Sequence, residues 1–136
     1  MKRRKAREYA LQLLFQTDFT QGKLNSKDIK EFWSDKKEAK DVKDFTEDLV
    51  RGTLGRLNEI DTIIETVTEN WLLKRMSAVD RNILRFAAYE ILYRKDIPSA
   101  VTINEAIEIA KKYSSTEAAP FLNGVLDRLA KEAGKG

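Results

Sequence analysis

The chain has 136 residues, the length of one domain, with 25 Lys and Arg against 22 Asp and Glu and neither His nor Cys. Without His and Cys, the sequence excludes disulfides, thiolate nucleophiles, imidazole bases and ordinary zinc sites, and with them much of enzymology. Five of the cations fall within the first seven residues, so the rest of the chain has 20 basic and 22 acidic residues. The high charge content and two prolines predict a helix-rich cytoplasmic protein. Because no glycine-rich phosphate loop and no metal-ligand motif is present, no cofactor and no metal is expected.

The first predicted helix runs from Arg3 to about Phe19 and carries the basic cluster at its start. Its apolar residues recur at three-and-four spacing: Ala6, Tyr9, Ala10, Leu13 and Leu14. Arg4 and Arg7 lie off this stripe, so both are expected to face solvent. Composition alone leaves two interpretations open, a phosphate-binding surface and a solubilising terminus. Successive cations at a helix start are unfavourable for stability, because the N-terminal end of the helix dipole is also positive. Their presence therefore favours the phosphate-binding interpretation.

A membrane or export role fits this start poorly. The apolar run from Tyr9 to Phe15 is short and no small-x-small cleavage site follows it. The apolar face contains the small residues Ala6 and Ala10, which suit helix packing better than insertion into an anionic membrane. No stretch approaches the roughly 20 apolar residues of a membrane span.

Two further helices are predicted before the middle of the chain. One runs from about Ser26 to Ala39 and buries Ile29, Phe32 and Trp33. The other begins at Asp41 and continues to Trp71, with Gly52 and Gly55 inside it, which indicates close helix packing or a break near Asn58. Five carboxylates crowd this region, and their spread around the helix predicts a solvated face and no metal site: Glu38, Asp41, Asp44, Glu47 and Asp48.

The second half begins at Ser77, which with Asp80 has the spacing of an N-terminal cap and capping carboxylate. Apolar residues between Val79 and Leu92 cover more than half of the helix circumference, as a central and nearly enclosed helix requires. This helix is the predicted core of the fold. It ends near Pro98, because proline cannot continue the hydrogen-bond ladder.

Two helices complete the chain. Thr102 and Glu105 have the spacing of a capping box, and the apolar stripe that follows extends to Tyr113. Pro120 is tolerated only in a first helical turn, so the last helix is expected to begin near residues 117–119. The sequence therefore predicts an all-α fold of about seven helices in one domain, with two packed sub-bundles at about residues 1–73 and 77–136.

Four segments carry a resemblance that periodicity does not provide: RRKAREYALQLLFQ, WLLKRMSAVDRNILRFAAYEIL, DIPSAVTINEAIEIAKKYSS and FLNGVLDRLAK. In order and spacing they resemble the bacterial transcription antitermination factors of the NusB family, over essentially the whole chain. The resemblance implies two roughly perpendicular helical sub-bundles. It also implies binding to single-stranded boxA RNA of ribosomal RNA transcripts, together with the ribosomal protein NusE, within an antitermination complex on RNA polymerase.

The resemblance also implies an RNA-binding set: Lys2, Arg3, Arg4, Lys5, Arg7, Tyr113, Glu117 and Asn123. Tyr113 is also explained as the end of an apolar stripe. Asn123 has a second interpretation too, in which the neighbouring Gly124 lets two helices approach. The chain departs from the family pattern at Pro120, where many members have lysine, and at Ser114, where glycine is common, so a phosphate contact is expected to be missing or moved.

For NusE, the resemblance points to the first and central helices, with the candidates Phe15, Asp80, Arg81 and Arg85. Capping alone also explains Asp80. The leading hypothesis is a non-enzymatic RNA-binding adaptor. The alternative is a NusB-like module associated with a ribosomal RNA methyltransferase, whose cofactor domain and catalytic cysteines this chain lacks. The sequence leaves homodimerisation open.

Overall fold

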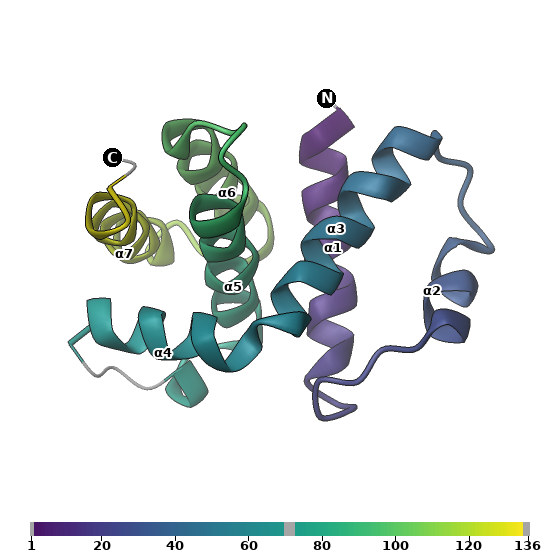
Figure 1. The fold of residues 1–136 in the computed structure, drawn as a ribbon, viewed down its shortest axis with the longest axis horizontal. Coiled ribbons are helices and arrows are strands. Elements are labelled where there is room, and N and C mark those ends of the chain that lie inside the picture. Colours follow the sequence, from purple (N-terminus) through teal and green to yellow (C-terminus); the bar gives the residue numbers. More distant parts are fainter. Residues whose placement is uncertain (1, 70–72, 135–136) are drawn as a thin grey trace.

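The computed structural model describes residues 2–69 and 73–134, which form seven α-helices, one short 3-10 helix and no strand. The predicted all-α fold class is confirmed (Figure 1). The elements are α1 (Lys2–Thr17), α2 (Ser26–Trp33), α3 (Lys40–Gly55), α4 (Leu57–Val67), η1 (Leu73–Arg75), α5 (Ala78–Tyr93), α6 (Ser99–Tyr113) and α7 (Ala118–Glu132). Trp71 lies outside the described residues. None of the helices described is both long and apolar enough to cross a membrane.

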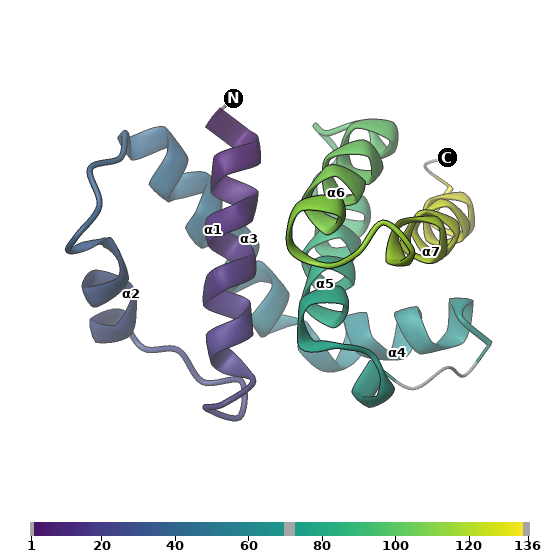
Figure 2. The same ribbon diagram turned by 180° about the vertical axis from the view of Figure 1, so that it is seen from behind.

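Helix α5 is the centre of the fold, as its apolar circumference predicts. It packs against α1 and α3 on one side and against α4, α6 and α7 on the other (Figures 1 and 2). Nine of its residues are buried, and Ile83, Leu84 and Phe86 are fully enclosed. The buried apolar side chains of α1 and of α3 to α7 belong to one continuous core.

Helix α4 packs mainly against α5 and α7, with only its start beside α3 (Figure 1). Its buried residues are Ile60, Ile64 and Val67. Arg56, whose backbone departs from helical geometry (φ −127°, ψ 27°), separates α3 from α4. This confirms a break close to Asn58.

Helix α2 is shorter than expected, because it ends at Trp33 and the chain then loops to Lys40. Asn25 caps its start in a capping box with Asp28. The helix is held by aromatic packing: Tyr9 of α1 makes edge contacts with Phe32 and Trp33, at centroid distances of 5.7 and 5.2 Å. The predicted burial of Trp33 is confirmed.

The predicted helix starts in the second half are confirmed in two cases and wrong in one. Ser77 Oγ accepts a hydrogen bond from the Asp80 backbone N–H at the start of α5, and α7 begins at Ala118 with Pro120 in its first turn. Helix α6, however, begins at Ser99 directly after Pro98, so Thr102 lies inside it and makes no capping box with Glu105. Both side chains are instead committed to buried polar contacts with other helices.

Candidate nucleic-acid interface

The start of α1 exposes three cations in fixed positions. Lys2 and Lys5 pair with carboxylates of the segment before and within α3: Lys2 Nζ lies 3.2 Å from Asp41, and Lys5 Nζ lies 2.7 Å from Glu38. The hydrogen bond from Lys5 lowers the pKa of Glu38, and Glu38 in turn raises the pKa of Lys5. The Arg3 guanidinium lies 4.5 Å from the centroid of the Phe45 ring. Because all three cations remain exposed, they are available to an anionic ligand.

Arg4 joins α1 to α6. Its guanidinium donates two hydrogen bonds to the Glu105 carboxylate, at 2.9 and 2.6 Å, in the bidentate geometry that arginine favours. These bonds hold the pKa of Glu105 below its usual value. About a third of the Arg4 side chain remains exposed. Arg4 therefore sits at the edge of the cationic surface and is tied into the fold at the same time.

Arg7 is buried, which corrects the expectation that it faces solvent. Only 2% of it is exposed, and it donates two hydrogen bonds to the fully buried Glu90 of α5, at 2.8 and 2.7 Å. Thr102 also donates to Glu90, and Glu105 lies 3.8 Å from the Arg7 guanidinium. Arg7 thus holds α1, α5 and α6 together and does not reach a ligand at the surface.

Sequence reasoning missed this polar cluster, although one signal was present. Glu90 is a lone acid within the apolar run from Phe86 to Ile91, on a helix predicted to be enclosed. A carboxylate in such a place must find a cation. The matching cation is Arg7, which lies 83 positions earlier in the chain. Helical spacing relates only residues within a few turns, so it does not predict this pair.

The end of α6 lies beside α1 and is exposed. Tyr113 and Lys112 both donate hydrogen bonds to Oε1 of Glu8, at 2.6 and 3.0 Å. Burial raises the pKa of Glu8, but these two bonds outweigh it and the pKa lies below its usual value. The Tyr113 side chain is 40% exposed, so it is not a core residue and its ring remains accessible for stacking.

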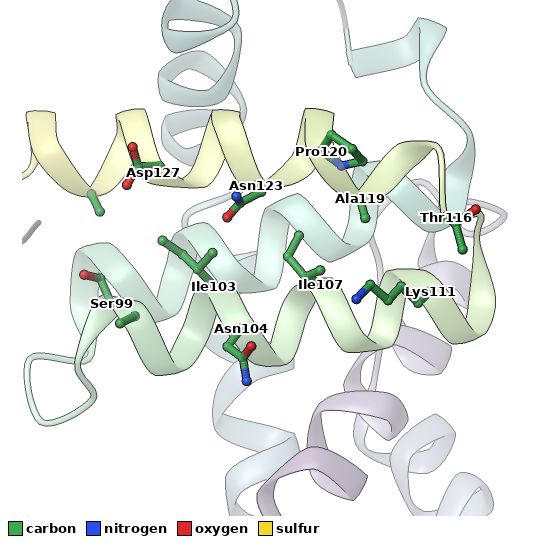
Figure 3. A pocket seen from close by; sticks show the side chains of 12 residues that line it. Ser99, Ile103, Asn104, Ile107, Lys111, Thr116, Ala119, Pro120, Asn123 and Asp127 are labelled. Atoms are coloured by element: carbon green, nitrogen blue, oxygen red, sulfur yellow. The ribbon is translucent and has the colours of Figure 1, made fainter.

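Glu117 and Asn123 are both exposed on α7. Glu117 lies at the N-cap, whereas Asn123 lines a groove of about 770 Å³ between α6 and α7 (Figure 3). Pro120, at the expected lysine position, lines the same groove and brings no charge. Gly124 faces open space, with no atom within 4 Å of an added Cβ, so it does not serve close helix packing.

The candidate RNA-binding cations of α1 divide between two directions. Lys2, Arg3 and Lys5 contact Asp41, Phe45 and Glu38, within or just before α3, whereas Arg4 contacts α6. Helix α6 lies between α1 and α7 on the side shown in Figure 2. Helix α1 flanks α6 on one side, through the pairs Arg4–Glu105 and Glu8–Lys112, and the groove flanks α6 on the other. Arg7 alone among these candidates is removed from the surface.

The end of α1 carries a second, aromatic surface. Phe15 and Phe19 are 38% and 76% exposed, and their rings lie 5.5 Å apart. Between them in sequence, Asp18 binds Arg81 and Arg85 of α5, at 3.1 and 3.4 Å. The Arg85 guanidinium also makes two 2.9 Å bonds to Asp61 of α4. The structure thus brings Phe15, Arg81 and Arg85 together, and adds Phe19 and Asp18, which sequence reasoning missed.

Asp80 lies apart from this aromatic surface. It lines a separate hollow of about 480 Å³ with Met76 and the exposed Phe121. Its Oδ1 is buried and accepts no hydrogen bond within residues 2–69 and 73–134. The capping role that explains Asp80 thus involves its backbone N–H, which donates to Ser77.

The fold and surface define a small all-helical protein that presents a cationic helix start beside an exposed aromatic residue and a groove. The NusB family model matches residues 4–131, so the chain belongs to the NusB family. The transcription antitermination protein NusB of Thermodesulfovibrio yellowstonii is 50% identical, over 97% of this chain and 93% of that protein. NusB of Listeria monocytogenes (serotype 4a) is 45% identical, over 97% and 98% respectively.

Solved structures agree in fold. A structure of NusB from T. maritima superposes with a TM-score of 0.86 at 43% identity, covering 96% of this chain and 91% of that one. A crystal structure of the antitermination factors NusB and NusE in complex with double-stranded RNA has a matching chain with a TM-score of 0.85 at 29% identity, covering 96% and 97%.

Proposed function

We propose that this protein is a transcription antitermination factor that binds boxA-type single-stranded RNA together with NusE, in the cytoplasm, and acts by assembly without catalysis. The observation that carries the proposal is the row of exposed cations on a rigid helix start, Lys2, Arg3 and Lys5, in a chain of the NusB family. The related complex of NusB and NusE with double-stranded RNA supports NusE and an RNA as partners. Read-through of terminators and ribosomal RNA synthesis would follow from that assembly on RNA polymerase.

An antitermination factor is favoured over a methyltransferase-associated module. The relatives named above are antitermination proteins, and the match extends over 93% to 98% of their lengths.

The RNA phosphates would compete with carboxylates of the protein itself. Lys2 and Lys5 pair with Asp41 and Glu38, but both lysine side chains are more than half exposed. The exposed Lys2–Asp41 pair contributes only about 0–1 kcal/mol, so a phosphate can replace Asp41 with little loss, whereas the Glu38 partner of Lys5 is only 10% exposed. The Arg3 guanidinium lies over the face of Phe45, and its charge also acts on Asp96 and contributes to the lowered pKa of that carboxyl.

The aromatic surface is the proposed NusE contact. Phe15 and Phe19 supply exposed apolar area, and the Asp18–Arg81–Arg85 cluster beside them supplies charge in a fixed arrangement. Exposed aromatic residues with an arginine nearby are typical of the centre of a protein interface. Asp80, which directly precedes Arg81 in α5, is the remaining candidate for this contact and lines a separate hollow with Phe121.

Removing two exposed cations should weaken RNA binding and its salt dependence. With phosphate contacts from Lys2, Arg3 and Lys5, log affinity should fall with log salt at a slope of about −2, since each single-strand contact contributes about −0.7. The double variant Arg3→Ala/Lys5→Ala should reduce the slope to about −0.7. Fluorescence anisotropy at several salt concentrations measures both slopes.

The matched control is Lys27→Ala/Lys30→Ala, which removes the same charge from exposed positions of α2. This variant should keep the wild-type slope. Equal slopes for wild type and both variants would contradict the assignment of phosphates to α1.

A further inference from the structure

The segment at the start of α3 places two carboxylates against the cationic start of α1. The starts of α1 and α3 lie at the same end of the molecule (Figures 1 and 2). Lys2 pairs there with Asp41, and Lys5 pairs with Glu38. The Asp41 side chain is 62% exposed, whereas that of Glu38 is only 10% exposed. The Lys5–Glu38 pair is therefore the one that a ligand from solution cannot replace without consequence.

Glu38 is held in place by contacts from two directions. One oxygen of its carboxylate, Oε2, accepts a hydrogen bond from the Tyr9 hydroxyl and lies 2.7 Å from the Lys5 ammonium. The Tyr9 ring in turn packs against Phe32 and Trp33 of α2, at centroid distances of 5.7 and 5.2 Å. The hydrogen bonds from Lys5 and then from Tyr9 lower the pKa of Glu38, so its carboxylate is ionised at neutral pH. Glu38 thus presents a fixed negative charge to Lys5.

An RNA phosphate at Lys5 would meet one of two obstacles. If the phosphate takes over the ammonium, Glu38 keeps its charge in a largely buried position and loses its cation, which is unfavourable. If the ammonium bonds both anions through different N–H groups, the phosphate and the carboxylate lie side by side and repel each other. In both cases Lys5 binds a phosphate less tightly than a lysine without a neighbouring carboxylate would.

We propose that Glu38 is an autoinhibitory residue of the RNA surface: its carboxylate, held by Tyr9 and α2, occupies Lys5 in the free protein and weakens the binding of α1 to any RNA backbone. This inference rests on the proposed function and adds a contact that regulates it. Because phosphate contacts carry no sequence information, the effect falls equally on boxA-type and unrelated strands. Weak backbone binding makes a stable complex depend on base contacts and on NusE.

The test is a titration of boxA-type RNA and a scrambled strand against the full chain with NusE. Glu38→Gln removes the charge, keeps the length of the side chain and retains an oxygen that accepts the Tyr9 hydrogen bond. This variant should bind both strands about fivefold more tightly, the upper end for a partly exposed ion pair. Its salt slope should remain about −2, because the number of phosphate contacts is unchanged. Fluorescence anisotropy measures the affinity and the slope.

Two further variants show whether Glu38 acts through Lys5. Asp44→Asn removes the same charge from an exposed position of α3, where Asp44 pairs with Lys40 at 2.7 Å. This matched control should change RNA affinity by less than about twofold. In the Lys5→Ala background, Glu38→Gln should give no gain in affinity, because the group that Glu38 occupies is then absent.

Three results would overturn the inference. If Glu38→Gln binds RNA no more tightly than Asp44→Asn does, Glu38 does not restrain Lys5, although the proposed function stands. If Glu38→Gln gives the same gain with and without Lys5, its charge acts on the whole strand and not through Lys5. If the wild type with NusE fails to bind the boxA-type strand at all, the proposed function fails and the inference fails with it.

Discussion

Replacing Arg7 with methionine should lower the free energy of unfolding by about 3–5 kcal/mol, the largest effect expected for any basic residue of α1. The substitution keeps the aliphatic volume of the side chain but leaves Glu90, which is fully buried, without its bidentate partner. Thr102 supplies one hydrogen bond and cannot neutralise the charge. Urea denaturation followed by circular dichroism measures the change.

Two controls separate the buried pair from a general effect of removing arginine. Arg51→Met, at an exposed position of α3, should change the free energy of unfolding by no more than about 0.5 kcal/mol. The double variant Arg7→Met/Glu90→Leu should recover much of the loss, because an apolar pair of similar volume often replaces a buried ion pair at little cost. A loss of less than about 1 kcal/mol in Arg7→Met, the range of exposed pairs, would contradict the burial of this pair.

Gly52→Ala should destabilise the protein by about 1–3 kcal/mol. A Cβ at Gly52 would lie 2.2 Å from Cε1 and Cζ of Tyr89, far inside contact distance. The tyrosine has little room to move, because it is buried in α5, donates a hydrogen bond to Asp48 and packs against Tyr93. The added methyl group must therefore push α3 away from α5.

Gly124→Ala is the matched comparison. Gly124 also lies inside a helix, but an added Cβ there meets nothing within 4 Å. Alanine should stabilise α7 by up to about 1 kcal/mol through its higher helix propensity. Thermal unfolding of the two variants should shift in opposite directions, and a Gly52→Ala protein as stable as wild type would contradict the close packing of α3 on α5.

The sequence predicted those features that depend on neighbours along the chain. Helical spacing located the apolar stripes and the enclosed helix α5, and Pro120 located the start of α7. Each of these follows from local geometry, because a proline or a three-and-four repeat limits the backbone within one or two turns. Helix α5 ends at Tyr93, earlier than the end expected near Pro98.

The predictions that were wrong have one cause in common. Each concerns a residue or helix whose position is set by a partner distant in sequence. Arg7 was assigned to the surface because it lies off the stripe of α1, but α5 and α6 cover that side and bring Glu90 to it. Thr102 has the spacing of a cap but bonds to the same Glu90. Helix α4 follows α3 in the chain and yet packs with α5 and α7. Tertiary packing decides such cases.

The buried pair also bears on the proposed RNA surface. Arg7 lies one helical turn after Arg3, so its anchoring to α5 fixes the orientation of α1 and of the exposed cations around it. Arg4 adds a second anchor on α6 through Glu105. Cations held in this way are preorganised, and a strand that binds them need not order the helix first.

The most direct test of the proposed function is a titration of labelled boxA-type RNA and a scrambled strand of the same composition, with and without NusE, at several salt concentrations. The account predicts that NusE tightens binding of the boxA-type strand much more than binding of the scrambled strand, with a salt slope near −2 from the cations of α1. Equal binding of both strands in the presence of NusE, or a slope near zero, would contradict it.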